Sequence, residues 1–149
     1  MLFAIDIGNS NIVMAVLDGK KIIDTLRVFT DKNKTSDEYW LLITEFFNQI
    51  GITRENIKDV IISSVVNPVL KRIREAFVNR LQIEPLIVNV DMDIGIKILY
   101  ENPKELGIDR VVNAIGGYEE HSGPLLIIDF GTATTYDVVD ENGNFLGGA

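Results

Sequence analysis

The chain has 149 residues, 46% of them hydrophobic, a length that suggests about one domain with a buried core. The net charge of −8 disfavours nucleic acid as a partner. No run reaches the ~20 apolar residues of a membrane span, the N-terminus lacks signal-peptide features, and the absence of cysteine excludes disulfides and thiolate metal sites. We therefore expect a cytoplasmic protein without membrane contact.

The first part of the chain predicts alternating strands and helices. Asp18-Gly19 is a tight-turn signal between two strands, Thr35 and Glu38 have the spacing of a capping box, and Asn67-Pro68 predicts an N-cap followed by proline at N1. The predicted strands are residues 2–7, 12–17, 21–29, 59–63 and 86–90. The predicted helices are residues 35–50, between the third and fourth strands, and 67–80, between the fourth and fifth. The order βββαβαβ indicates an α/β fold in which helices flank a mixed sheet.

A further helix is predicted from Asp109 to Glu120, and the opening phrase of the sequence then returns. Residues 2–13 read LFAIDIGNSNIV and residues 125–136 read LLIIDFGTATTY. Aligned without gaps, Asp6 falls on Asp129, Gly8 on Gly131, Asn9 on Thr132 and Asn11 on Thr134. Asn142-Gly143 supplies a hairpin turn near the place where Asp18-Gly19 does so in the first copy. One such stretch is most simply an ordinary hairpin turn, but two in the same context indicate an internal repeat.

The residue types of the repeat suit the binding of phosphate. Glycine after a strand lets the main chain approach a ligand closely, so that successive N–H groups can cradle phosphate oxygens. The neighbouring amides and hydroxyls add hydrogen-bond donors; they are Asn9, Ser10, Asn11, Thr132, Thr134 and Thr135. A carboxylate repels phosphate but favours a cation, so Asp6 and Asp129 suit a metal-bridged polyphosphate. The sequence contains no Walker motif and no GxGxxG.

These motifs resemble those of the acetate and sugar kinase, Hsp70 and actin superfamily. Residues 6–11 (DIGNSN) and 129–135 (DFGTATT) are most similar to type III pantothenate kinases, and so is a third stretch, YENP at 100–103 followed by LGIDR at 106–110. The resemblance implies a duplicated ribonuclease H-like (actin-like) fold, with a mixed five-stranded sheet in the first half. We predict that residues 1–108 form this half and that residues 109–149 begin the second. Family members are longer, so this piece alone is expected not to be a competent kinase.

The same resemblance implies an activity and its site residues. The expected reaction is ATP-dependent phosphorylation of pantothenate to 4′-phosphopantothenate, the first step of coenzyme A biosynthesis, with Asp109 as general base. Asp129 would bind a monovalent cation, potassium or ammonium, and Asp6 would bind magnesium directly or through water. Residues implied in ATP binding are Asp6, Ile7, Gly8, Asn9, Ser10, Asn11, Ile12, Val13, Gly131 and Thr132. Residues implied in pantothenate binding are Tyr100, Gly107, Ile108, Asp109 and Arg110. A homodimer is also implied.

Three alternatives remain open at the level of the sequence. Asp109 is equally suited to act only as the N-cap of the helix that follows it. The protein could instead be another kinase of the superfamily, acting on a sugar or a carboxylate. It could also be a nucleotide-binding regulator without catalytic activity, similar to relatives described as transcription accessory factors. The segment of Asp109 and Arg110 separates these functions, because only a kinase needs a base beside an acceptor alcohol.

Overall fold

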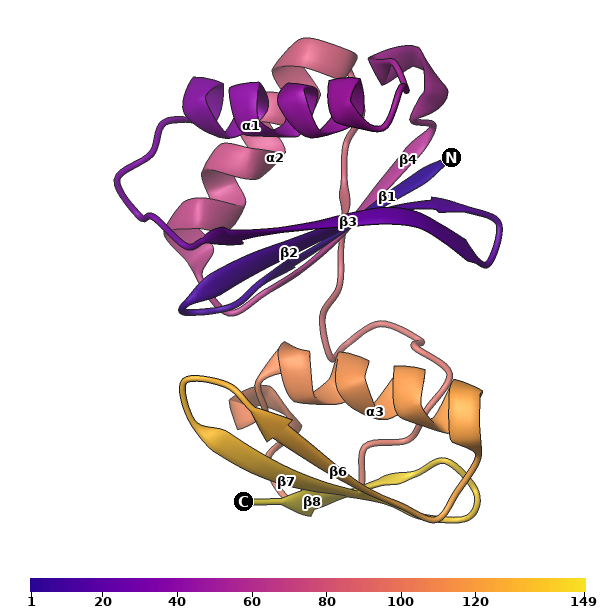
Figure 1. Cartoon of the computed structure of the whole chain (residues 1–149). Helices are drawn as coiled ribbons and strands as arrows, with labels where there is room; N and C mark the ends of the chain where they lie inside the picture. Colours follow the sequence, from indigo (N-terminus) through magenta and orange to yellow (C-terminus); the bar gives the residue numbers. More distant parts are fainter. The chain divides into compact units, whose positions relative to one another are not determined.

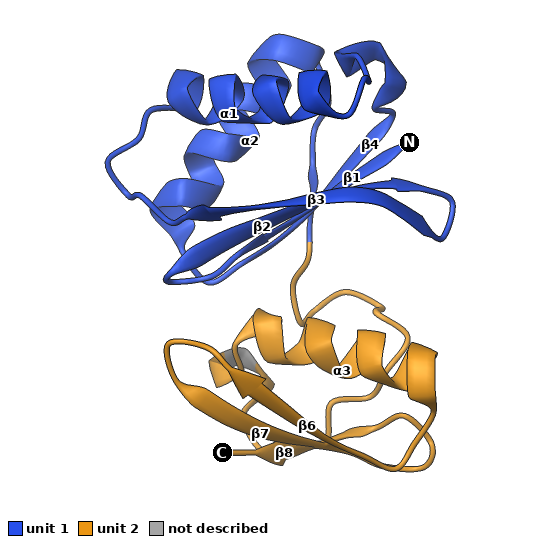
Figure 2. Cartoon of the chain, viewed as in Figure 1, with its two compact units in different colours: residues 1–87 blue, residues 88–149 orange. Residues whose placement is uncertain are grey.

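A computed structural model describes residues 1–149, apart from the side chain of Lys104. The chain forms two compact units, Met1–Ile87 and Val88–Ala149 (Figure 2). Residues 88–108, which the sequence groups with the first half, lie in the same compact unit as the second hairpin. The assignment of 1–108 and 109–149 to two repeated halves stays a prediction.

The first unit is built on a five-stranded mixed sheet with the strand order β3-β2-β1-β4-β5 (Figure 1). Its strands are β1 (Leu2–Ile7), β2 (Asn11–Asp18), β3 (Lys21–Phe29), β4 (Asp59–Ser64) and β5 (Leu86–Ile87). The first three pair antiparallel, whereas β4 is parallel to β1 and β5 is parallel to β4. The predicted fold class and the predicted order of elements are therefore confirmed for this unit.

Two helices, α1 (Ser36–Gln49) and α2 (Asn67–Leu81), cover one face of this sheet, and a short turn of 3₁₀ helix, η1 (Arg54–Asn56), follows α1 (Figure 1). The capping box at Thr35 and Glu38 is confirmed, with both of its reciprocal contacts present. The alternate residues Phe3, Ile5 and Ile7 of β1 point into the core and are almost fully buried. Their face of the sheet is therefore the packed one, and the face that carries Asp6 is more open.

The second unit contains the helix α3 (Ile108–His121) and a three-stranded antiparallel sheet. The strands are β6 (Leu125–Phe130), β7 (Thr134–Val139) and β8 (Phe145–Gly148), and a short helical turn, η2 (Pro103–Glu105), precedes α3. The predicted turn at Asn142-Gly143 joins β7 to β8, with Gly143 at a φ of 82°. Upstream, the backbone of Lys97 and Leu99 hydrogen-bonds to Phe145, which ties this segment to β8.

The structure corrects the gapless alignment of the two repeats. In the first hairpin Ile7 pairs with Ile12, and in the second Phe130 pairs with Thr134. The turn therefore spans residues 8–11 in the first copy and 131–133 in the second, one residue fewer. Asn11 consequently corresponds to Ala133, and Ile12, rather than Asn11, corresponds to Thr134.

The two units use opposite faces of their equivalent hairpins. In the first unit, α1 and α2 bury the face that carries Phe3, Ile5 and Ile7. In the second, α3 packs on the other face, where a Cβ at Gly117 would lie 3.1 Å from Ile127 and 3.5 Å from Leu125. The residues equivalent to the buried core of β1 are consequently exposed, with Leu126 at 63%, Ile128 at 43% and Phe130 at 81%.

Two local predictions were wrong in detail. The strand predicted over 86–90 ends at Ile87, because Asn89 begins a turn in which its side chain accepts the N–H of Asp91 and its carbonyl accepts that of Met92. The N-cap of α2 is Val66 rather than Asn67: the carbonyl of Val66 already accepts two helical N–H groups. Asn67 is therefore the first helical residue.

Candidate functional site

The first candidate phosphate loop is the tight turn between β1 and β2. The N–H of Gly8 donates to the carbonyl of Asn11 at 3.0 Å, which closes the turn, while Asn9 and Asn11 are exposed and Ser10 is half-buried. Ile7 and Ile12 are fully buried, so only their backbone can face a ligand, and Val13 is half-buried. The turn therefore offers backbone groups and short polar side chains, as an anion site requires.

Thr30 braces this turn from the end of β3, and the sequence analysis did not identify it. Its hydroxyl donates to the carbonyl of Gly8 at 2.7 Å, and its N–H donates to the carbonyl of Ser10 at 2.9 Å. Thr30 is 5% exposed. Two bonds from one buried residue fix the turn, and the only signal in the sequence is a hydroxyl residue directly after a strand.

Asp6 lies at the carboxyl end of β1, next to the carboxyl end of the parallel strand β4. Asp6 is exposed and pairs in register with Ser63, whose buried hydroxyl has no hydrogen-bond partner among the described residues. Ligands of open α/β sheets bind outside the carboxyl ends of parallel strands. Asp6 therefore lies at the edge where this fold places its ligands, and Ser63 is a neighbour that the sequence did not single out.

The second candidate loop follows β6. The N–H of Gly131 donates to the carbonyl of Ala133 at 3.1 Å, and Gly131 and Thr132 are exposed. Asp129 is exposed at the end of β6, and the side-chain amide of Asn113 on α3 donates to its Oδ2 atom at 3.1 Å. This bond leaves further carboxylate lone pairs for a cation, so the oxygen donor suits a hard metal ion.

Asp109 lies in the second position of α3, because Gly107 is the N-cap residue and Ile108 the first helical residue. The N-cap alternative for Asp109 is therefore wrong in that form. Its Oδ1 atom accepts the N–H of Arg110 at 2.9 Å, so the carboxylate still contacts the N-terminal turn. A Cβ at Gly107 would lie 2.5 Å from Oδ1, so glycine leaves room for the carboxylate there.

Arg110 reaches from α3 to β7. Its Nε donates to the Oδ1 atom of Asp137 at 2.8 Å, and its Nη2 lies 2.6 Å from the same oxygen. Asp137 is fully buried, while the side chain of Arg110 keeps 18% of its surface exposed. Asp137 was not among the residues predicted from the sequence, although an acidic residue between Tyr136 and Val138 is unusual within a strand.

Tyr100 and Arg110 lie over neighbouring residues of β8. A Cβ at Gly147 would be 3.1 Å from the Tyr100 ring, and a Cβ at Gly148 would be 2.6 Å from Nη2 of Arg110. The structure therefore gathers these two predicted substrate residues against one pair of glycines, close to the start of α3. Ile108 lies mostly buried in the first turn of this helix, and Gly107 precedes it.

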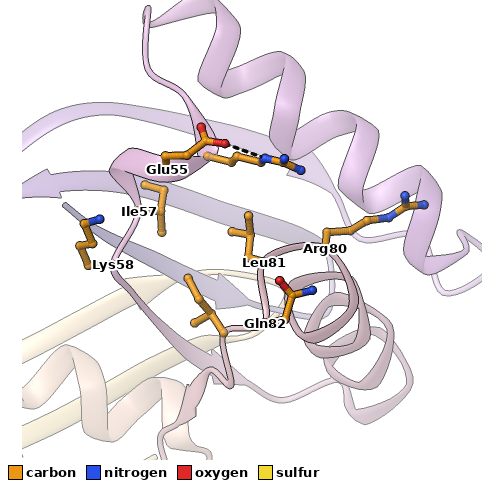
Figure 3. A pocket seen from close by; sticks show the side chains of 8 residues that line it. Glu55, Ile57, Lys58, Arg80, Leu81 and Gln82 are labelled. Atoms are coloured by element: carbon orange, nitrogen blue, oxygen red, sulfur yellow. Dashed lines mark hydrogen bonds and ion pairs between the residues drawn. The ribbon is translucent and has the colours of Figure 1, made fainter.

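The larger described pocket lies elsewhere. It has a volume of about 460 Å³ and is shown in Figure 3; its lining residues are Arg54, Glu55, Ile57, Lys58, Arg80, Leu81, Gln82 and Ile83. Lys58 directly precedes β4, whose first residue pairs with Leu2 at the start of β1. The pocket therefore lies at the amino ends of these strands, away from the Gly8 turn, and it holds none of the predicted site residues.

A smaller described pocket, of about 330 Å³, lies in the second unit. Its lining residues are Val90, Asp91, Met92, Ile94, Ile96, Ile98 and Pro103. None of the predicted site residues lines it, although it includes chain neighbours of Tyr100. Pocket size therefore does not point to the residues that the sequence predicted.

The fold is shared with solved structures of low sequence identity. An activator of 2-hydroxyisocaproyl-CoA dehydratase from Clostridium difficile matches with a TM-score of 0.59 and 15% identity, over 99% of this chain and 44% of that one. A putative 2-dehydro-3-deoxygalactonokinase from Sinorhizobium meliloti matches with a TM-score of 0.50 and 10% identity, over 100% of this chain and 52% of that one. The chain thus shares the actin-like fold of these structures.

Sequence relatives narrow this class to one family. The family model described as type III pantothenate kinase matches residues 2–149, and the chain belongs to that family. Type III pantothenate kinases of Geotalea daltonii and Geobacter sulfurreducens are 46% and 45% identical over 149 residues, which is 100% of this chain and 58% of each relative. The chain therefore spans little more than half the length of these relatives.

No helix in the described part of the chain has both the length and the apolar character needed to cross a bilayer.

Proposed function

We propose that the whole protein phosphorylates pantothenate with ATP, giving 4′-phosphopantothenate in the first step of coenzyme A biosynthesis. The observation that carries this proposal is the family match over residues 2–149, which includes both hairpin motifs and the segment around Asp109. The arrangement in the second unit supports it, because Tyr100 and Arg110 lie against neighbouring glycines of β8 and Asp109 directly precedes Arg110 in the first turn of α3. A cytoplasmic location is part of the same proposal.

The ATP phosphates would be bound by the two repeated turns. Each turn is closed by a bond from the N–H of its glycine, and each presents exposed polar residues beside it, Asn9 and Thr132 among them. The dehydratase activator that shares the fold has ADPNP bound, which supports a nucleotide as the ligand. The proposed contacts comprise the backbone of residues 7–13 and 131–132 and the side chains of Asn9, Ser10, Asn11 and Thr132.

Two cations are proposed at the carboxylates that end β1 and β6. Mg²⁺ in kinase sites is held by one or two carboxylates together with phosphates and water, so the exposed Asp6 is a suitable donor. Asp129 is proposed to bind potassium or ammonium, and the bond from Asn113 fixes its carboxylate. These ions would neutralise the charge that develops during phosphoryl transfer.

Asp109 is proposed as the general base that takes the proton of the attacking pantothenate hydroxyl. Its carboxylate is half-buried at the N-terminal turn of α3, and Arg110 beside it supplies the positive charge that an anionic substrate requires. Gly107 and Ile108 would shape the same site. A homodimer is proposed from the family alone.

The proposal is tested by product identification. The whole protein is incubated with ATP, Mg²⁺ and either pantothenate, a sugar panel or acetate, in sodium and in potassium buffers, and the phosphorylated product is identified by mass. We expect phosphopantothenate, formed faster in potassium, and loss of most of the potassium advantage in Asp129→Asn. A phosphorylated sugar or acetate would contradict the proposal and identify the protein as another kinase of the superfamily. ATP binding without any phosphorylated product would instead indicate a nucleotide-binding regulator.

A further inference from the structure

A buried ion pair connects α3 to the sheet of the second unit. Asp137 is 0% exposed and its Oδ1 atom takes both contacts from Arg110, the hydrogen bond from Nε at 2.8 Å and the approach of Nη2 at 2.6 Å. The second oxygen, Oδ2, is buried without a hydrogen-bond partner among the described residues. Among the described residues, Arg110 is therefore the one side chain that pairs with the Asp137 carboxylate.

The position of Arg110 near the N-terminus of α3 makes a negatively charged partner favourable. Arg110 is the third residue of α3, where a positive charge is disfavoured by the positive end of the helix dipole. The N-terminal turn alone therefore does not hold the guanidinium, and the attraction to Asp137 does. Because arginine is always charged and its stem has several rotatable bonds, one fixed carboxylate largely decides where the head lies.

Strand β8, which pairs with β7 beside Asp137, leaves room for the Arg110 guanidinium. Asp137 pairs in register with Gly148 of β8, and a Cβ at Gly148 would lie 2.6 Å from Nη2 and 2.8 Å from Oδ1 of Asp137. The same Cβ would also collide with the carbonyl of Tyr136. Glycine at this position leaves the space in which the guanidinium and the carboxylate meet.

We propose that Asp137 is a positioning residue for substrate binding: it holds the Arg110 guanidinium in the orientation in which Arg110 binds the carboxylate of the substrate. This inference rests on the proposed function, in which Arg110 is a pantothenate-binding residue. Nε and Nη2 both lie against Asp137, and Nη2 is buried there, so Nη1 is the guanidinium nitrogen left to meet a ligand; the side chain as a whole keeps 18% of its surface exposed. Asp137 touches Arg110 and acts through it.

The test compares two acceptors that differ only at the carboxylate end. Pantothenate carries the carboxylate, whereas pantothenol has a primary alcohol in its place and keeps the hydroxyl that is phosphorylated. In the whole protein, Asp137→Asn should raise KM for pantothenate about tenfold to a hundredfold, the equivalent of one hydrogen bond to a charged group. KM for pantothenol, KM for ATP and kcat should change little, since the lost contact is one of binding alone.

A matched control separates positioning from general damage to the second unit. Asp140→Asn weakens the turn between β7 and β8, where Asp140 accepts bonds from Asn142 and Asn144, without touching Arg110. It should leave the ratio of the two KM values unchanged. Thermal unfolding is measured for each variant. If Asp137→Asn does not fold, Asp137→Glu takes its place in the comparison, because it keeps the charge but shifts the carboxylate by one methylene.

A double-mutant cycle assigns the effect to the pair. In an Arg110→Met background, Asp137→Asn should add nothing further to KM for pantothenate. An unchanged KM for pantothenate in folded Asp137→Asn, or an equal rise for both acceptors, overturns the inference and leaves the proposed function standing. A wild-type protein that phosphorylates neither acceptor overturns the proposed function, and the inference falls with it.

Discussion

Asp109 is half-buried in the first turn of α3. Its carboxylate accepts the N–H of Arg110, which gives it a structural contact at the N-terminal turn of α3. A carboxylate oxygen is also the group that a general base needs in order to take the proton of the substrate hydroxyl. Because Gly107 and not Asp109 is the N-cap, the structural contribution of Asp109 is one local bond, and the catalytic proposal can be tested apart from it.

Asp109→Asn should separate these two roles. The Asn side chain keeps an oxygen that can accept the N–H of Arg110, so the unfolding temperature should change little. Its basicity is lost, so kcat for pantothenate should fall by about 10²–10⁴ while ATP still binds. The measurements are steady-state kinetics, ATP titration and thermal unfolding on the whole protein. Turnover close to the wild-type rate in the folded variant would remove Asp109 from the role of base.

At the scale of elements, a turn, a cap and strands that depend on neighbouring residues were predicted correctly from the sequence. The turn at Asp18-Gly19, the capping box of α1 and the strands β1 and β3 are where the pattern placed them, because each depends on residues close together in the chain. Thr30 and Asp137 were missed because their contacts lie 22 and 27 residues away, with Gly8 and Arg110. Strand alternation can place such side chains on a face, but not name the partner they meet there.

The capping box of α1 should make the stability of the first unit depend on pH. Hydrogen bonds from the backbone N–H of Thr35 and then from its hydroxyl lower the pKa of Glu38 below 4.5. A carboxyl whose pKa is lower in the folded state stabilises the fold above its unfolded pKa, and this contribution is lost as the pH falls through the folded pKa. Stability should therefore decrease on acidification below about pH 5.

Glu38→Gln is the variant that isolates this effect. Glutamine can complete a capping box but does not titrate, so the variant should keep most of its stability at neutral pH and lose part of the decline with acid. Urea unfolding from pH 7 to pH 3 measures it, with Glu45→Gln as a control in the same helix, away from the cap. Thr35→Ala should cost about 1 kcal/mol at neutral pH. Parallel curves for wild type and Glu38→Gln would contradict the assignment.

At the scale of the whole chain, the two hairpins differ in the face that helices cover. The hairpin of β6 and β7 keeps the apolar face that its counterpart buries under α1 and α2, yet α3 packs on the opposite face. Leu126 and Ile128 stand opposite Val138 and Tyr136, so these residues form one continuous exposed apolar area. The sequence predicted the repeat, but the missing turn residue and the face that α3 takes depend on tertiary packing.

This apolar face should dominate the binding of apolar probes by the 149-residue chain. Contiguous exposed apolar patches attract such probes and promote association, whereas single exposed apolar residues do not. The double variant Leu126→Ser, Phe130→Ser should therefore remove most of the fluorescence of a bound naphthalene-sulfonate dye and reduce self-association in sedimentation. Leu41→Ser, at an exposed position of α1 that is 67% accessible, is the control and should change neither. Equal dye binding by wild type and the double variant, with the fold intact by circular dichroism, would show that the dye binds elsewhere, and the face would then have no special affinity.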